Sequence, residues 1–277
     1  MNNTYSDWLL VSDIDGTLLD KKRRLPDVNK KAIQSFVDNG GNFTLCSGRN
    51  LQSLGIHYKK INVKTPAICL NGAGIYDFYS EKELFYTPIS PEGEKILLDI
   101  CDKYKTIQFT VFDMNTVYLY THKCLYGRIL SVLDGLPYKL CKTKADLPTG
   151  RWGKATIVTL PHICRKIEKF LKNSDNIKLF DCFYTSPISL EIVHSGVNKG
   201  SAVAKLADYL KINAQNVAAI GDYYNDEAML RSVNHPVCCG QAPDDIKALC
   251  EYVTCHCNDG AVNDFINYVE TNYIKRR

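Results

Sequence analysis

Short apolar runs that end in polar or charged residues are the feature that most limits how this chain can fold. Residues 8–12 are almost wholly apolar and stop at an Asp-Ile-Asp-Gly sequence, and residues 42–46 and 66–70 form similar runs. Such runs are typical of strands buried on both faces of a parallel sheet. Residues 27–37 and 50–60 between them are predicted as helices. This strand–helix–strand order predicts an α/β layer with right-handed crossovers.

The middle of the chain has a different pattern. A predicted helix over 91–105 precedes strands over 107–112 and 116–120, which a three-residue turn joins and which are therefore expected to be antiparallel. Further elements are predicted at 125–133 (helix), 154–160 (strand), 163–171 (helix), 177–184 (strand) and 188–193 (strand). We interpret this stretch as an inserted α+β unit.

The parallel pattern returns after residue 193. Helices are expected over 200–210 and 225–232, with a strand over 217–220 between them and later strands near Val237 and Val253. We therefore predict an α/β fold, with a Rossmann-like parallel-sheet core and an inserted α+β cap domain. The core is assigned to residues 1–83 and 188–277, and the cap to residues 84–187.

Composition excludes several classes of function. The 34 basic and 30 acidic residues are spread along the chain, which argues against a nucleic-acid surface. No apolar run approaches the roughly 20 residues of a membrane-spanning helix. The twelve cysteines, in a chain that opens without an export leader, are expected to be reduced thiols in the cytosol. The sequence leaves the oligomeric state open.

Two carboxylates lie two residues apart at the end of the first predicted strand. Asp13 and Asp15 occupy the position where open parallel sheets place their ligand sites. One carboxylate can attack phosphorus, while the other protonates the leaving oxygen and later deprotonates the attacking water. Because a carboxylate repels a phosphate dianion, the site needs a cation, and Mg²⁺ takes oxygen ligands. The pair therefore indicates magnesium-dependent phosphoryl chemistry.

The strand predicted at 217–220 supplies more acid. The residues that follow it are Gly221-Asp222-Tyr223-Tyr224-Asn225-Asp226. Asp222 is expected to complete the metal site, and Asn225 and Asp226 to hold its waters or orient its ligands.

Two other strand ends provide donors for phosphate. Ser47-Gly48-Arg49 follows the strand at 42–46 at a helix start, where a hydroxyl and free backbone N–H groups bind an anion. Lys199 also opens a helix and supplies a fixed positive charge. Each motif alone also fits a calcium-like loop, a helix cap or a tight turn. Their order, each after a strand, is the specific signal.

Together these segments resemble the four motifs of the haloacid dehalogenase superfamily, and more narrowly its Cof-type phosphatases with a large cap. They are Ser12-Asp13-Ile14-Asp15-Gly16-Thr17-Leu18-Leu19, Cys46-Ser47-Gly48-Arg49, Gly196-Val197-Asn198-Lys199-Gly200 and Gly221-Asp222-Tyr223-Tyr224-Asn225-Asp226. The resemblance spans nearly the whole chain. One departure is Gly240-Gln241-Ala242, which stands where Gly-Asn-Ala is usual.

The resemblance implies a role for each matching residue. Asp13 would be the nucleophile and Asp15 the acid and base, with Mg²⁺ held by the Asp13 carboxylate, the Asp15 backbone carbonyl and the Asp222 carboxylate. Phosphate would be bound by Ser47, Gly48, Lys199 and Asn225, with Asp226 supporting the metal. The function implied is hydrolysis of small phosphorylated metabolites such as sugar phosphates through an aspartyl-phosphate.

Selectivity for the leaving group is expected to come from the cap, because the core contacts only the transferring group and the metal. Candidate substrate contacts are Arg49, Asn71, His122, Arg128, Arg151, Trp152 and Lys154. Three alternatives remain open: a phosphomutase of the same superfamily, a non-enzymatic sensor of phosphorylated metabolites and a dehalogenase. The intact acid pair argues against the sensor.

Overall fold

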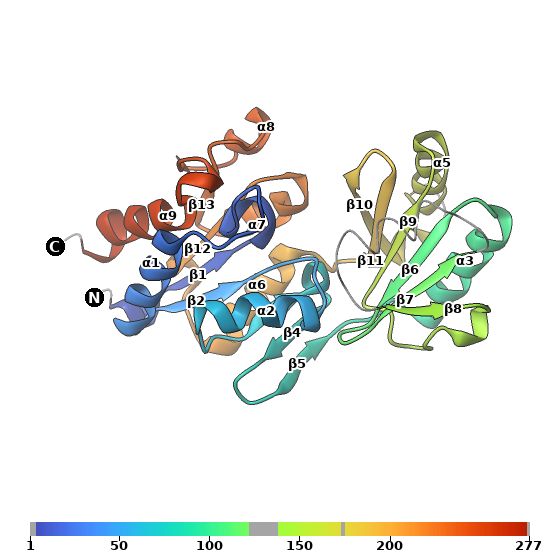
Figure 1. Ribbon diagram of the computed structural model, residues 1–277, viewed down its shortest axis with the longest axis horizontal. Coiled ribbons are helices and arrows are strands. Elements are labelled where there is room, and N and C mark those ends of the chain that lie inside the picture. Colours follow the sequence, from blue (N-terminus) through green and yellow to red (C-terminus); the bar gives the residue numbers. More distant parts are fainter. Residues whose placement is uncertain (1–3, 122–137, 173–174, 276–277) are drawn as a thin grey trace.

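The computed structural model describes residues 4–121, 138–172 and 175–275, and its two parts lie side by side (Figure 1). One part is built around a parallel sheet and contains both ends of the described chain. The other lies at the far end of the molecule, between β5 (Lys82–Tyr86) and α6 (Lys199–Leu210) in sequence. A Rossmann-like core with an α+β insertion confirms the predicted fold class.

The core sheet has five parallel strands in the order β14-β13-β12-β1-β2. Their bounds are Leu9–Ser12 (β1), Asn42–Leu45 (β2), Val217–Gly221 (β12), His235–Cys238 (β13) and Tyr252–Val253 (β14). The central strand β1 pairs with β2, which follows it in sequence, and with β12, from the end of the chain. Strand order therefore changes direction beside β1, where the carboxyl ends of parallel strands bind ligands.

Helices cover both faces of this sheet. α1 (Asp27–Asp38) and α9 (Ala261–Val269) pack with Leu10 on one face, whereas α6 and α7 (Glu227–Ser232) pack with Leu9 and Val11 on the other. Coverage of both faces explains why β1 is a continuous apolar run. The remaining core helices are α2 (Leu51–Ile61) and α8 (Asp244–Lys247). Among the described helices, none is both long and apolar enough to cross a membrane.

The strand predicted at 66–70 departs from the parallel pattern. β3 (Ala67–Cys69) pairs antiparallel with β4 (Gly74–Asp77), which pairs with β5, and one parallel bridge between Cys46 and Ile68 links β3 to the end of β2. The reason is the turn after β3, in which three successive residues have positive φ: Leu70 (51°), Asn71 (57°) and Gly72 (101°). This turn reverses the chain within a few residues.

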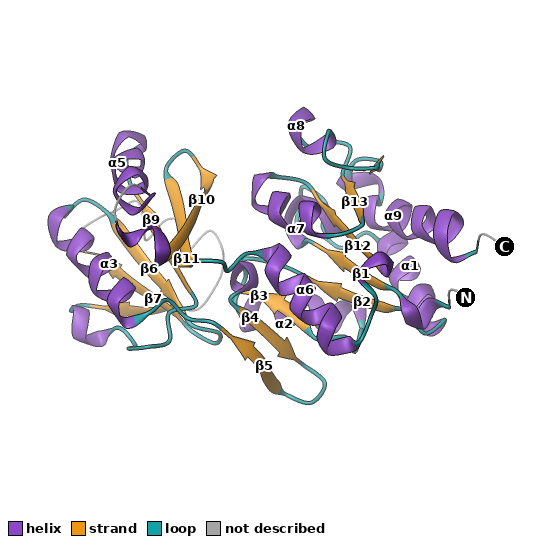
Figure 2. Ribbon diagram, turned by 180° about the vertical axis from the view of Figure 1, so that it is seen from behind, coloured by secondary structure: helices purple, strands orange, loops and turns teal. Residues whose placement is uncertain are grey.

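The cap is a six-stranded sheet in the order β10-β11-β9-β6-β7-β8. Its strands are Gln108–Phe112 (β6), Val117–Thr121 (β7), Tyr138–Cys141 (β8), Lys154–Val158 (β9), Phe180–Ser186 (β10) and Ser189–His194 (β11). β6 and β7 are antiparallel, as their short connection predicts. α3 (Pro91–Lys103) and α5 (Pro161–Lys172) cover the face turned away from the core (Figure 2).

The domain limit drawn at residue 188 requires correction. β11 was assigned to the core with residues 188–277, but it pairs with β9 and β10, with Leu190 opposite Ile157. The alternating pattern of β11 fits either sheet, and its partners are a long-range property that the sequence does not display. The core therefore resumes after His194. The helix predicted at 125–133 lies outside the described residues.

Candidate active site

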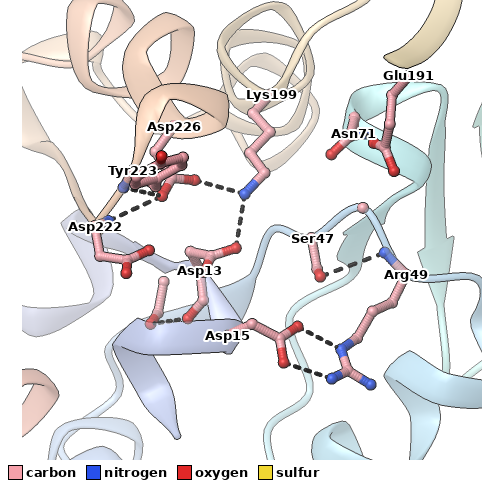
Figure 3. Close-up of polar contacts among 12 residues, drawn as sticks. Asp13, Asp15, Ser47, Arg49, Asn71, Glu191, Lys199, Asp222, Tyr223 and Asp226 are labelled. Atoms are coloured by element: carbon pink, nitrogen blue, oxygen red, sulfur yellow. Dashed lines mark hydrogen bonds and ion pairs between the residues drawn. The ribbon is translucent and has the colours of Figure 1, made fainter. Parts of the chain in front are cut away.

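Asp13 lies at the carboxyl end of β1, where its backbone N–H donates to Ile220 of β12 at 3.0 Å. Its carboxylate is buried and accepts a hydrogen bond from Lys199 Nζ at 2.7 Å, and the same ammonium lies 2.5 Å from Asp226 Oδ1 (Figure 3). Burial and the nearby Asp226 carboxylate raise the pKa of Asp13 well above its usual range. Burial alone would lower the pKa of Lys199, but Asp13 and Asp226 raise it. Lys199 is thus a fixed cation beside Asp13.

Asp226 organises the loop after β12. Its Oδ2 accepts hydrogen bonds from the backbone N–H groups of Asp222 at 2.9 Å and Tyr223 at 3.3 Å, while Oδ1 contacts Lys199 (Figure 3). The side chain of Asp226 is completely buried. Both of its oxygens are therefore occupied by donors of this chain, and it positions Asp222 and Lys199.

Asp222 faces the first motif at close range. Gly16 has φ of 81°, and a Cβ at that position would overlap the Asp222 carboxylate. A residue without a side chain is thus required for the two loops to approach. Burial and the nearby Asp226 carboxylate raise the pKa of Asp222 to about 7.

Asp15 is paired with Arg49 rather than with Lys199. The guanidinium donates two hydrogen bonds to the carboxylate, at 2.8 Å from Nε and 2.6 Å from Nη2 (Figure 3). Burial opposes ionisation of Asp15, but the two hydrogen bonds from Arg49 hold its pKa below the usual range. Arg49 also donates to Ser53 at 2.5 Å. The predicted acid and base is therefore an ionised carboxylate in this conformation.

Ser47 and Gly48 form a tight loop after β2. Ser47 is buried, and its hydroxyl accepts a hydrogen bond from the Arg49 backbone N–H at 3.3 Å. Asn71 lies against this loop: its N–H donates to the Ser47 carbonyl at 3.0 Å, and a Cβ on Gly48 would come within 2.7 Å of its Oδ1. The turn after β3 thus fixes the loop that is expected to bind phosphate.

Two charged residues of the cap also contact this loop. Lys154 Nζ of β9 lies 2.8 Å from Glu191 Oε1 of β11 and donates to the Gly48 carbonyl at 2.9 Å. The other oxygen of Glu191 accepts a hydrogen bond from Asn71 Nδ2 at 2.5 Å. This ion pair is nearly buried and joins the cap sheet to the core.

A cavity of about 610 Å³ lies between the two parts. The predicted residues Asp13, Asp15, Ser47, Gly48, Arg49, Asn71, Lys154 and Asn225 all line it. Lys199 and Asn225 line a second, smaller cavity of about 280 Å³ beside α7. The first two strand-end motifs and Asn225 of the fourth thus line one cavity together with the cap sheet, Lys199 lines the smaller cavity, and Asp222 lines neither.

Other predicted cap contacts lie elsewhere. Arg151 is not among the residues that line the cavity: it pairs with Glu83 at 3.0 Å and its guanidinium lies over the ring of Tyr86. Trp152 is buried in the apolar cluster of the cap and donates to the Pro148 carbonyl. The predicted contacts His122 and Arg128 lie outside the described residues.

The oxygen-rich donor set fits a divalent cation. Asp13, Asp222 and Asp226 each offer a carboxylate oxygen, and these atoms lie within 4.8 Å of one another. Oxygen ligands of this kind suit Mg²⁺. Burial and the Asp226 carboxylate both disfavour ionisation of Asp222, and a cation bound beside it would offset them. Because Asp226 is occupied by Lys199 and two N–H groups, Asp13 and Asp222 are the carboxylates that remain available.

Two residues of the site were not predicted as such. Gln241 donates from Nε2 to the Gly16 carbonyl at 2.5 Å and accepts from the Cys257 N–H at 3.1 Å, so it ties the first motif to the end of the core. The departure from Gly-Asn-Ala at this position was the available signal. Glu191 had no comparable signal, because its role depends on the register of β11 against β9.

Known proteins similar to this chain fall into one family. Residues 10–266 match a family described as haloacid dehalogenase-like hydrolase. A 5-amino-6-(5-phospho-D-ribitylamino)uracil phosphatase of Bacillus subtilis is 25% identical over 249 residues, 89% of each chain. A pyridoxal phosphate phosphatase of Escherichia coli is 22% identical and covers 87% of this chain and 90% of its own.

A solved structure has the same fold. The haloacid dehalogenase-like hydrolase of Bacteroides thetaiotaomicron superimposes with a TM-score of 0.85 at 20% identity, over 95% of this chain and 99% of its own. The family match spans both the core and the cap and includes all four strand-end motifs. The chain therefore belongs to the haloacid dehalogenase-like hydrolases and is a phosphatase of the Cof type.

Proposed function

We propose that this enzyme hydrolyses phosphomonoesters of small metabolites, sugar phosphates among them, through an aspartyl-phosphate on Asp13 and with Mg²⁺ as cofactor. The observation that carries the proposal is the buried Asp13 carboxylate, which lines the cavity, lies 2.7 Å from the Lys199 ammonium and has an oxygen within 4.8 Å of an Asp222 carboxylate oxygen. The two relatives named above carry the names of phosphatases for a phosphorylated ribitylamino compound and for pyridoxal phosphate. Both names describe small phosphate esters.

In the first step an Asp13 oxygen attacks phosphorus and the bond from phosphorus to the leaving oxygen breaks. Ser47, the Gly48 N–H and Lys199 bind the phosphoryl oxygens, with Asn225 beside them. Mg²⁺, held by the Asp13 and Asp222 carboxylates and the Asp15 carbonyl, would lower the repulsion between the nucleophile and the phosphate. Asp226 holds Asp222 and Lys199 in place.

Asp15 supplies the proton to the leaving oxygen and then removes one from the attacking water, which releases phosphate and restores Asp13. Its pairing with Arg49 keeps it ionised, so Arg49 must leave and Asp15 must take up a proton from water before it can donate one to the leaving oxygen. A phosphate dianion is a competing partner for the guanidinium. We therefore propose that substrate draws Arg49 away from Asp15. We also propose that the enzyme acts in the cytosol, consistent with described cysteines that are all free thiols.

The test is phosphate release from a panel of sugar phosphates, nucleotides and an aryl phosphate, with and without Mg²⁺. Release should require Mg²⁺ and be lost in Asp13→Asn, which keeps the shape of the side chain but removes the nucleophile. Near-normal release by a pure Asp13→Asn preparation, or full activity in excess chelator, would contradict the mechanism. Isomerisation of a sugar phosphate with a bisphosphate activator would indicate the phosphomutase instead.

A further inference from the structure

The face of the cap sheet that is turned toward the core is mostly polar, although Phe112, Val117 and Val158 also line the cavity. Every second residue of three strands lines the cavity: Gln108 and Thr110 of β6, Thr156 and Val158 of β9, and Ser189 and Glu191 of β11. The residues between them, such as Phe109, Ile157 and Leu190, lie in the apolar cluster under α3 and α5. Because successive side chains of a strand point to opposite faces, the residues of this alternating set face the cavity.

Two polar atoms of this face have no hydrogen-bond partner among residues 4–121, 138–172 and 175–275. Gln108 Oε1 and Thr156 Oγ1 are buried and unpaired, although Gln108 donates from Nε2 to Thr110 at 3.2 Å. Both residues are more than nine-tenths buried. An unpaired buried polar atom destabilises a fold, so its presence calls for another explanation. Here both residues line the cavity that holds Asp13, where a bound molecule would supply the missing partners.

We propose that Gln108 and Thr156 determine specificity by hydrogen-bonding a hydroxylated leaving group. The inference rests on the proposed phosphatase activity and specifies its substrate. Gln108 Oε1 only accepts hydrogen bonds, and Thr156 Oγ1 both donates and accepts, so a substrate hydroxyl suits each of them. The Glu191 carboxylate also lines the cavity, but its two oxygens already accept from Lys154 and Asn71. The face therefore selects a neutral polyol or sugar over an alkyl chain.

The register of the sheet arranges this face in rows. Lys154, opposite Phe112, donates to the Gly48 carbonyl at 2.9 Å and so marks the end nearest the phosphate loop. Thr156 lies one row further along β9, and Gln108 lies opposite Val158, in the row beyond. Rows on one face are about 6–7 Å apart, since two residues separate them. Thr156 is thus nearer the phosphate than Gln108, which only longer leaving groups reach.

The test compares two substrates of equal length, a hexitol 1-phosphate and n-hexyl phosphate. The variants are Thr156→Val, which keeps the shape and removes the hydroxyl, and Gln108→Leu. The control is Thr159→Val, because Thr159 Oγ1 is also buried without a partner but does not line the cavity. Each specificity variant should lower the ratio of kcat/KM for hexitol phosphate to kcat/KM for hexyl phosphate by about five- to tenfold, the effect of one hydrogen bond. Thr159→Val should leave the ratio unchanged.

A second readout separates binding from a structural role. Thr156→Val should not lower the melting temperature, because the removed hydroxyl has no partner within the described part of the chain. With glycerol 3-phosphate the effect of Gln108→Leu should be smaller than with the hexitol ester. An unchanged substrate ratio in both variants overturns the inference, while an unaltered enzyme that hydrolyses none of these esters overturns the proposed function itself.

Discussion

Removal of the buried cation beside Asp13 gives the sharpest test of the site. In Lys199→Met the methionine fills a similar volume, but Asp13 and Asp226 lose the ammonium that lies 2.7 and 2.5 Å from them. Removing one member of a buried ion pair destabilises a protein by about 3–5 kcal/mol, because the remaining charge stays buried. Lys199 is only 1% exposed, so solvent offers no compensation. We expect a loss of this size at pH 8 in the presence of a chelator.

The loss should depend on pH in a defined direction. Without Lys199 the Asp226 carboxylate repels the Asp13 carboxylate without compensation, so the pKa of Asp13 rises further and the folded state binds about one proton that the unfolded state lacks. Stability of the variant then falls as pH rises above the unfolded value of about 4, by roughly 1.4 kcal/mol per pH unit, until the folded pair ionises. The variant should therefore lie closer to the unaltered enzyme at pH 5 than at pH 8.

Unfolding of the core can be followed by itself. The chain has two tryptophans, and Trp8 lies in the core cluster whereas Trp152 lies in the cap cluster. Urea unfolding in a Trp152→Phe background, followed by fluorescence, therefore reports on the core. The matched control is Lys205→Met, an exposed position of the same helix, which should change stability by less than about 0.5 kcal/mol.

Magnesium should restore part of the lost stability. A ligand that binds only the folded state stabilises it, and the uncompensated carboxylates of Lys199→Met should gain more from Mg²⁺ than those of the unaltered enzyme. A loss below about 1 kcal/mol at pH 8, or equal protection of both proteins by Mg²⁺, would refute this account of the charge balance.

Two further predictions concern the surroundings of the site. Burial lowers the pKa of His57 to about 4, so the folded state binds fewer protons than the unfolded state and stability falls as pH drops from about 6.5 to 4. Urea unfolding at pH 7 and at pH 5 measures this loss. In His57→Gln the loss between the two pH values should be smaller by about 1–2 kcal/mol. Gly72 has φ of 101°, and a Cβ there would overlap the Asn198 carbonyl before α6, so Gly72→Ala should lower both the melting temperature and kcat. Gly150 has φ of 70° but lies in open space, so Gly150→Ala should lower only the melting temperature, and by less.

Much of the core could be predicted because its signals are local. A buried parallel strand is a short apolar run, and the residue at its carboxyl end is read directly from the sequence, as for Asp13 and Ser47. The reversal after β3 could not be predicted in this way, because it depends on positive φ at Leu70, a residue that rarely adopts it. The strand predicted at 66–70 is present as β3, but it pairs antiparallel with β4 instead of joining the parallel core sheet.

The cap contacts were harder to predict because they depend on register between distant strands. Lys154 was a candidate, but its pairing with Glu191 joins residues 37 positions apart, on neighbouring strands of the cap sheet. Arg151 was proposed as a substrate contact because of its charge. In the structure Arg151 pairs with Glu83, and the next residue, Trp152, is buried in the cap. The charges in the sequence indicate which residues near β9 are polar. Which of these residues face the cavity depends on how β9 pairs with its neighbouring strands.

The contact of Lys154 with the Gly48 carbonyl links the cap, where the leaving group is expected to bind, to the loop that is expected to bind the phosphate. Ser47 and Gly48 are expected to bind the transferring phosphate, and the same loop is contacted by a cap residue two positions before Thr156. A leaving group that displaces the cap sheet would therefore also disturb the phosphate loop. Because Glu191 holds Lys154 and accepts from Asn71, which lies against Gly48, such a displacement would break charged hydrogen bonds in a nearly buried site. We therefore expect recognition of the leaving group and placement of the phosphate to be coupled through the Lys154–Glu191 ion pair.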